Sequence, residues 1–149
     1  MCSSDLKLSE TFNVTSIDGT PSTVTITING TNDAATVSSA TVALDETNNA
    51  LTTSGTLTSS DVDNPNTFNP ANLNGTYGSF SIDADGNWGF TANDAFDSLN
   101  VGDKLSETFN VTSIDGTPST VTITINGTND AATVSSATVA LDEIGRAHV

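Results

Sequence analysis

The stretch Glu107-Thr-Phe-Asn-Val-Thr-Ser-Ile-Asp-Gly-Thr-Pro-Ser-Thr-Val-Thr-Ile-Thr-Ile125 determines which fold class the chain can adopt. Its last part, Thr120–Ile125, alternates valine or isoleucine with threonine, and this period of two indicates a strand with one buried and one exposed face. Its first part places Phe109 and Val111 on one face of another strand in the same way. Between the two strands, Ile114–Pro118 contains the Asp-Gly and Pro residues that favour a turn. The stretch therefore predicts a β-hairpin.

Further strands follow the same pattern on the N-terminal side of this hairpin. The predicted strands are Val37–Leu44, Ser54–Ser60, Gly78–Ile82 and Asn87–Thr91, and the last two are joined by a turn at Asp83–Gly86. Their inward residues are expected to form the core, and these are Val42, Leu44, Leu57, Phe80, Ile82, Trp88 and Phe90. We expect Asp61–Thr76 to be a loop with one short strand around Phe68, and Asp94–Leu99 to form one helical turn. Short strands with turn signals at near-regular spacing predict an all-β, Ig-like β-sandwich.

The chain contains an internal repeat, because Lys7–Glu46 recurs unchanged at Lys104–Glu143 with a period of 97 residues. This period exceeds the roughly 20 to 50 residues of solenoid repeats, so each unit is expected to be a domain with its own core. We expect residues 7–33 to be the C-terminal hairpin of a preceding repeat, 34–132 to be one complete repeat, and 133–143 to be the first strand of the next. The chain then holds one complete repeat and two partial flanking repeats.

The repeat also raises the question of which hairpin completes the sandwich. The hairpin 104–130 belongs to the complete repeat, and 7–33 is an identical competitor. The first copy would have to cross a strand length of roughly 30 Å with no spare linker to reach the same place. We therefore predict that the complete repeat closes with residues 104–130, and that residues 7–33 stay free or pair between chains.

Both termini resemble translated sequencing adapter. Ile144-Gly-Arg-Ala-His148 can be encoded by the start of a common sequencing-library adapter, and Met1-Cys-Ser-Ser-Asp-Leu6 by its reverse complement in frame. We interpret residues 1–6 and 144–149 as adapter-derived and the chain as a metagenomic fragment of a longer protein; ordinary termini are the alternative. The two segments hold the only cysteine, histidine and arginine of the chain, so the native part contains none of the three.

The charge balance restricts the classes of partner. The chain has 18 acidic residues against 3 basic ones, and its formal net charge is −15. This excess argues against nucleic acid, whose affinity comes largely from cationic contacts to phosphate, and against anionic membrane surfaces. No apolar stretch is long enough for membrane insertion. Uncompensated carboxylates repel one another in a compact fold, so a bound cation would stabilise it. Ca²⁺, which takes carboxylate and carbonyl oxygens, is the expected cofactor; acid that serves solubility alone is the alternative.

The acidic residues are expected to gather at the two ends of the sandwich. Repeats joined without a linker begin at one end and leave at the other, which requires an odd number of strands, and about seven is the simplest count. This count places the turns with Asp61, Asp83 and Asp115 beside the preceding junction. It places Asp94, Asp97 and Asp103 beside the following one. The predicted metal ligands are Asn32, Asp33, Asp61, Asp63, Asp83, Asp85, Asn129 and Asp130.

The Asp83 turn and the pair Asp45 and Glu46 each have a simpler interpretation than metal binding. Asp83 begins a segment with the spacing of a calcium loop, but Trp88 stands where an EF-hand loop needs its glycine, so a plain hairpin turn is favoured. Asp45 and Glu46 could contribute to a cluster at a junction, although an exposed strand end is the commoner explanation.

Three motifs of the chain resemble the VCBS repeat family, which occurs in tandem in very large bacterial adhesins of the RTX type. The motifs are Thr76-Tyr-Gly-Ser-Phe-Ser-Ile-Asp-Ala-Asp-Gly-Asn-Trp88, Leu105-Ser-Glu-Thr-Phe-Asn-Val111, and the segment from Val121 to Asn129-Asp130-Ala131. The resemblance covers about one period. It implies a cadherin-like or Ig-like sandwich, calcium at or near the junctions, extracellular or cell-surface placement and type I secretion of the parent protein.

The chain departs from the family pattern at two places. Gly89-Phe90 stands where the pattern has Thr-Tyr after the tryptophan, and Ala132 stands where a proline usually follows Asn-Asp-Ala. The missing proline removes a fixed φ at the junction, which weakens the expectation of a stiff linker.

These patterns favour a structural spacer repeat of a large secreted or cell-surface adhesin, and they disfavour an enzyme. The native part offers no histidine or cysteine as base or nucleophile, and paired carboxylates would need a cleft with opposed acids. A carbohydrate- or protein-binding module is the alternative, which exposed Tyr77 and Trp88 on a flat face would favour. The expected partners are neighbouring repeats and, through the parent adhesin, cell-surface or biofilm glycans or proteins.

Overall fold

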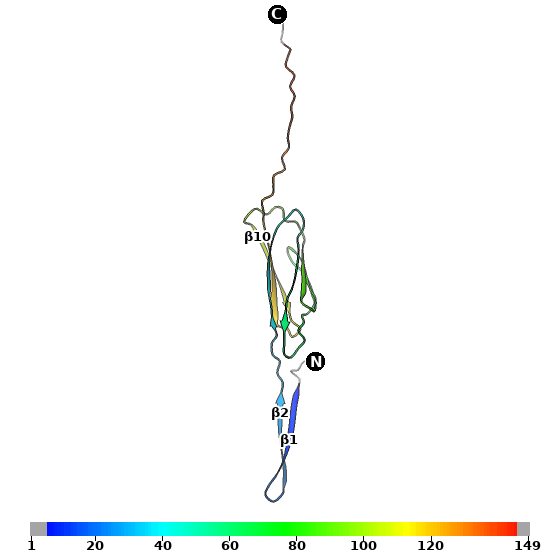
Figure 1. Ribbon diagram of the computed structural model, residues 1–149, viewed down its shortest axis with the longest axis vertical. Helices are drawn as coiled ribbons and strands as arrows, with labels where there is room; N and C mark the ends of the chain where they lie inside the picture. Colours follow the sequence, from blue (N-terminus) through cyan, green and yellow to red (C-terminus); the bar gives the residue numbers. More distant parts are fainter. Residues whose placement is uncertain (1–5, 146–149) are drawn as a thin grey trace.

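The computed structural model describes residues 6–145 and shows an elongated molecule with three parts (Figure 1). A hairpin of β1 (Lys7–Thr15) and β2 (Pro21–Asn29) forms one end. A β-sandwich lies in the middle, and residues 131–145 extend from its other end without forming a strand. The adapter interpretation of residues 1–5 and 146–149 concerns positions outside the described residues.

The sandwich is built from nine short strands in the part of the chain described. Their bounds are β3 Thr36–Val37, β4 Ala40–Asp45, β5 Thr52–Thr56, β6 Ser59–Ser60, β7 Ala71–Asn74, β8 Gly78–Ile82, β9 Asn87–Ala92, β10 Lys104–Thr112 and β11 Pro118–Asn126. One sheet has the order β10-β11-β4, in which β4 runs parallel to β11. The other has the antiparallel order β5-β9-β8-β7, and β3 and β6 form a short separate ladder. The predicted all-β, cadherin-like or Ig-like sandwich is confirmed.

Two of the predicted strands are each divided in the structure. The predicted strand Val37–Leu44 becomes β3, which pairs with β6, and β4, which pairs with β11 in the three-stranded sheet. The chain passes from the β3–β6 ladder to this sheet after Ser38, whose N–H donates to the carbonyl of Thr58 at 2.9 Å. The predicted strand Ser54–Ser60 is likewise divided into β5 and β6 at the buried Leu57.

The predicted loop Asp61–Thr76 contains a regular strand, but not where the sequence indicates one. Ala71–Asn74 forms β7 at the edge of the four-stranded sheet. Phe68 is buried and makes only an isolated bridge to Ser113. Proline stands three residues before and two residues after Phe68, and a residue without an N–H cannot extend a ladder there.

The helical turn predicted for Asp94–Leu99 is wrong. The segment contains a turn in which the N–H of Leu99 donates to the carbonyl of Phe96 at 3.0 Å, and no helix occurs within residues 6–145. Phe96 has a φ of 64°, in the left-handed region, which a right-handed helix cannot continue through. Its ring packs edge-on against Tyr77 at a centroid distance of 5.9 Å, and this contact holds the residue in place.

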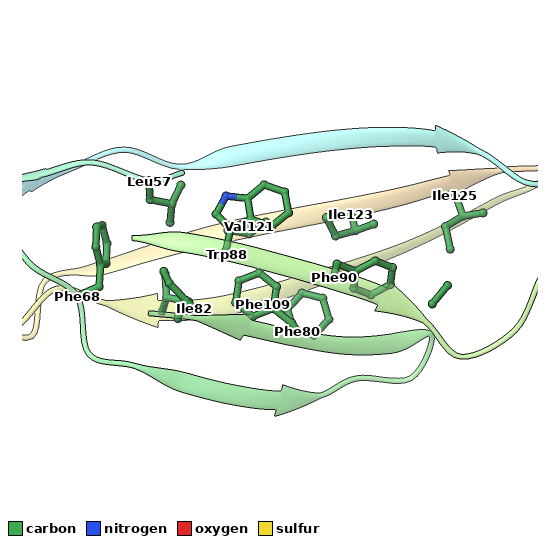
Figure 2. Packing of buried hydrophobic residues seen from close by; sticks show 12 residues of the cluster. Leu57, Phe68, Phe80, Ile82, Trp88, Phe90, Phe109, Val121, Ile123 and Ile125 are labelled. Carbon is green, nitrogen blue, oxygen red and sulfur yellow. The ribbon is translucent and has the colours of Figure 1, made fainter. Parts of the chain in front are cut away.

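The core lies between the two sheets and is rich in aromatic rings (Figure 2). Phe80 is stacked on Phe109 at a centroid distance of 4.7 Å and lies 6.0 Å from Trp88. Trp88 is only 4% exposed and packs over Gly55, where an added Cβ would lie 2.7 Å from the indole ring. The predicted core residues of β8 and β9 and Leu57 are buried, and Val42 is half-buried against them. Leu44 is half-buried but is not part of this cluster.

The sandwich closes with the hairpin of residues 104–130, as predicted. β11 pairs with β4 over Val121–Asn126 and Ala40–Asp45, while the identical β1–β2 hairpin lies outside the sandwich. The difference in burial is large: Phe109 is 4% exposed, and its counterpart Phe12 is 49% exposed. One sequence therefore occurs in this chain both inside a core and on a free hairpin.

Candidate cation sites at the ends of the sandwich

The end of the sandwich that follows β2, here called the N-terminal end, is organised by the carboxylate of Asp61. Its Oδ1 accepts hydrogen bonds from the backbone N–H groups of Asp63 (2.8 Å) and Asn64 (3.1 Å), and its Oδ2 accepts one from the Asn64 amide (3.2 Å). An aspartate that bonds to the N–H groups two and three residues ahead fixes a turn. This turn holds Asp63 and Asn64 toward the preceding junction.

The residues of that junction dock onto the turn. The N–H of Asp33 donates to Oδ2 of Asp63 at 2.5 Å, and the Asn64 amide donates to Oδ1 of Asn32 at 2.8 Å. The structure therefore brings together two predicted pairs of ligands, Asn32 with Asp33 and Asp61 with Asp63.

Asp115 lies at the same end and also holds the junction. Its Oδ2 accepts a hydrogen bond from the N–H of Ala35 at 2.9 Å, and its Oδ1 accepts hydrogen bonds from the Ser113 hydroxyl and from the Thr117 N–H. The bond from the Ser113 hydroxyl, followed by the Ala35 and Thr117 N–H groups, holds the pKa of Asp115 well below its ordinary value. Asp115 is therefore a charged residue that fixes the junction to the sandwich.

The hairpin turn that carries Asp83 and Asp85 stays separate from this group. Oδ1 of Asp83 accepts from the N–H groups of Asp85 and Asn87 at 2.9 Å each, and its Oδ2 accepts from the Asn87 amide at 3.2 Å. These bonds, led by the one from the Asn87 side chain, lower the pKa of Asp83. Gly86 has a φ of 84°, as a tight turn requires. The local bonds favour the plain hairpin turn over the calcium loop.

At the opposite end, here called the C-terminal end, one carboxylate is almost completely buried. Glu46 directly follows β4 and is 3% exposed. Its Oε1 accepts from the backbone N–H of Thr128 at 2.9 Å and from the Thr128 hydroxyl at 2.5 Å. Its Oε2 is buried without a hydrogen-bond partner, as is Oδ1 of Asn126 on the adjacent strand β11. A buried carboxylate oxygen is costly unless it is hydrogen-bonded, paired with a charge or bound to a metal.

Two further carboxylates, Asp97 and Asp130, lie at the same end. A hollow of about 180 Å³ is lined by residues 97–101 and 128–130, and these include Asp97, Asn129 and Asp130. Partial desolvation, followed by repulsion from Glu46 and then from Asp97, raises the pKa of Asp130. The C-terminal end thus concentrates negative charge that its own hydrogen bonds do not neutralise.

Comparison with known families identifies the domain. Residues 32–127 match the sequence profile of the bacterial cadherin-like domain. The chain belongs to the bacterial cadherin-like domain family. No curated protein matches the chain. Bacterial cadherin-like domains occur in surface or extracellular proteins, so the chain is a module of that class. The described residues include no helix long and apolar enough to cross a membrane.

The cadherin-like domain holds its acids in two groups rather than in a finished metal centre. Within residues 6–145, no three acidic side chains converge closely enough to form a ligand set by themselves. At the N-terminal end the cluster mixes carboxylates with the amides of Asn32 and Asn64. At the C-terminal end, Asp130 lies on an exposed segment without a strand, so its position can adjust on binding.

Glu46 is the residue whose importance the sequence interpretation underestimated. The chain places Asp45 on the exposed face of β4 and turns Glu46 inward, contrary to the explanation of an exposed strand end for both residues. The alternation of β4 contains this signal, because Ala40, Val42 and Leu44 are its half-buried residues and a period of two continues to residue 46. An acidic residue at an inward-facing position of a strand is unusual, so it marks a candidate functional residue.

Proposed function

We propose that this cadherin-like module is a structural spacer repeat, of the VCBS type, in a large secreted or cell-surface bacterial adhesin. Calcium binds at the junctions between successive repeats and stiffens the array. The exact 97-residue repeat and the distribution of acids to both ends of the sandwich support this function. Secretion of the parent by a type I pathway, as in RTX-type adhesins, belongs to the same proposal.

The observation that carries the calcium proposal is the buried carboxylate of Glu46. The residue is only 3% exposed, and its Oε2 has no hydrogen-bond donor in the protein. Calcium is a hard cation that binds carboxylate oxygens, and a bound ion would satisfy this oxygen. After desolvation, repulsion from Glu46 and Asp97 raises the pKa of Asp130, and a bound cation would also relieve this repulsion.

The residues of both ends can contribute to one junction. Asn129 and Asp130 repeat the sequence of Asn32 and Asp33, which dock on the loop with Asp61 and Asp63. In an array, the next repeat would offer the same acidic loop to Asn129 and Asp130. Calcium takes about six to eight oxygen ligands, so a site shared by the C-terminal end of one repeat and the N-terminal end of the next suits it better than either end alone.

A binding module of the same surface protein is the alternative function, and the aromatic residues do not favour it. Trp88 is in the core, and Tyr77 is half-buried against Phe96, so neither ring lies on an open flat face where a sugar could stack. We further propose that the module is not an enzyme. Its partners are then the neighbouring repeats, and contacts to glycans or proteins of cell surfaces or biofilms are made by the parent adhesin.

Calcium titration of two matched variants tests this proposal. Glu143 is preceded by the same sequence as Glu46 but lies on the exposed C-terminal segment, so Glu46→Gln and Glu143→Gln make one chemical change in two environments. Titration calorimetry should show that Glu46→Gln weakens calcium binding at least about tenfold, a loss of about 1.4 kcal/mol, whereas Glu143→Gln binds like the unchanged protein. Equal affinities in all three proteins would exclude Glu46 as a ligand, and binding in none would refute the calcium proposal.

A further inference from the structure

The free β1–β2 hairpin presents a complete apolar face to solvent. Its apolar side chains are between 45% and 60% exposed, and these are Leu8, Phe12, Val14, Val24, Ile26 and Ile28. In the identical hairpin β10–β11, five of the six counterparts are buried in the core and the sixth, Leu105, packs against it. The apolar face that is exposed on β1–β2 is therefore the face that β10–β11 buries in the sandwich.

The second copy shows which strand covers the open edge of this hairpin. β4 lies parallel along β11, with Val42 opposite Ile123 and Leu44 opposite Ile125. The pairing ends with the amide of Asn126 donating to Oδ1 of Asp45 at 3.1 Å. The structure therefore identifies the sequence of β4 as the one that pairs with this hairpin.

The same strand sequence occurs a second time in the chain and is unpaired there. Residues 133–143 repeat residues 36–46, and in the described structure they form no strand. Val139 and Leu141, the counterparts of Val42 and Leu44, are 74% and 87% exposed. The chain thus carries an open hairpin edge and an exposed strand of matching sequence.

These two elements cannot meet within one molecule. The β1–β2 hairpin projects from the N-terminal end of the sandwich, and residues 131–145 extend from its C-terminal end, with the whole sandwich between them (Figure 1). An extended strand and an open edge at opposite ends of one molecule are complementary between two molecules, and contacts of this kind generate open chains rather than closed rings.

We propose that the β2 edge of this chain is a docking site for residues 137–142 of a second copy of the chain. The added strand lies parallel to β2 in the register of β4 on β11. It places Val139 opposite Ile26 and Leu141 opposite Ile28, and Asp142 accepts a hydrogen bond from the Asn29 amide. Strand addition supplies main-chain hydrogen bonds for affinity and alternate side chains for specificity. The product is a head-to-tail filament of single chains.

Sedimentation of matched variants tests the docking. In chelator and about 150 mM salt, which screens the strong negative charge, the mass of the unchanged protein should rise with concentration beyond that of a dimer. Val139→Asp places a charge on the paired apolar face and should weaken association at least about tenfold. Val134→Asp is the control, because Val37, its counterpart, pairs with β6, which the hairpin lacks, and this variant should associate like the unchanged protein.

Disulfide trapping tests the register. In a Cys2→Ser background, Thr25→Cys with Thr138→Cys should give a ladder of crosslinked oligomers on oxidation, because the counterparts Thr122 and Thr41 are opposite each other. Thr25→Cys with Asp142→Cys, four residues out of register, should not. A protein that stays monomeric at all concentrations would overturn the proposal. Association that survives Val139→Asp, or crosslinks independent of register, would show instead that the hairpins themselves associate, which also overturns it.

Discussion

Phe109 and Phe12 allow one residue type to be compared in two environments, because they occupy the same position of an identical sequence. Phe109 is stacked on Phe80 and packs against Phe90 at a centroid distance of 5.9 Å, whereas Phe12 lies on the free hairpin. Truncating a buried phenylalanine to alanine removes its transfer free energy and leaves a cavity, which typically costs about 3 to 5 kcal/mol. We expect Phe109→Ala to lose this amount and Phe12→Ala to leave the stability of the sandwich unchanged.

The loss should be large compared with the total stability of the domain. A domain of about 100 residues is stable by only about 5 to 15 kcal/mol, so Phe109→Ala should lower the melting temperature by at least about 12 °C or unfold the sandwich. Thermal unfolding followed by the fluorescence of Trp88, the only tryptophan, reports on the sandwich alone. Equal losses in the two variants would refute the assignment of Lys104–Asn126 to the core.

Two further predictions concern the turns of the sandwich. Hydrogen bonds, first from Ser113, lower the pKa of Asp115 below its ordinary value of 3.8, so its contribution to stability is present above this pH and is lost as the pH falls below it. Asp115→Asn should therefore lower the neutral-pH melting temperature and flatten its decline below about pH 4, whereas Asp18→Asn, on the free hairpin, should leave the Trp88 transition unchanged. Gly86→Ala should destabilise the sandwich more than Gly116→Ala. Both glycines have positive φ, but only at Gly86 would the added Cβ collide with the carbonyl oxygen of Leu57. A smaller loss of stability at Gly86 than at Gly116 in chemical denaturation would contradict this.

The sequence predicted the hairpins and the core well because strict alternation reports which face of a strand is buried. It failed where the decisive interaction lies outside the alternating segment. Nothing in Val37–Leu44 reveals that its two halves pair with different sheets, because the partner of each half is remote in sequence. Phe96 combines a left-handed conformation with packing against Tyr77, a residue remote in sequence, and no local rule predicts this.

The candidate sites were predictable to a similar extent. The sandwich has nine strands in the described residues and not the predicted seven, but an odd number still placed the loops of Asp61 and Asp115 beside Asp33 and Ala35. A turn at one end of a sandwich must lie near the segment that enters there. It did not distinguish Asp83, whose oxygens bond to its own turn, from acids that face the junction. Nor did it identify Glu46, because only the packing of Thr128 over its carboxylate shows that one oxygen stays without a partner.

Calcium-dependent stability is the most direct test of the central proposal. Extracellular modules bind calcium with a Kd of about 10⁻⁴ to 10⁻³ M, so one site in about 10 mM calcium adds roughly 1.4 to 2.7 kcal/mol of stability. For a domain of about 100 residues this corresponds to a rise in melting temperature of roughly 6 to 20 °C. The measurement is a thermal melt of the Trp88 signal in chelator and in about 10 mM calcium at constant ionic strength, with magnesium as the control because it demands tighter octahedral geometry. We expect calcium to raise the melting temperature within this range and magnesium to raise it less; coincident melts in chelator and calcium would contradict the proposal that calcium stabilises this repeat.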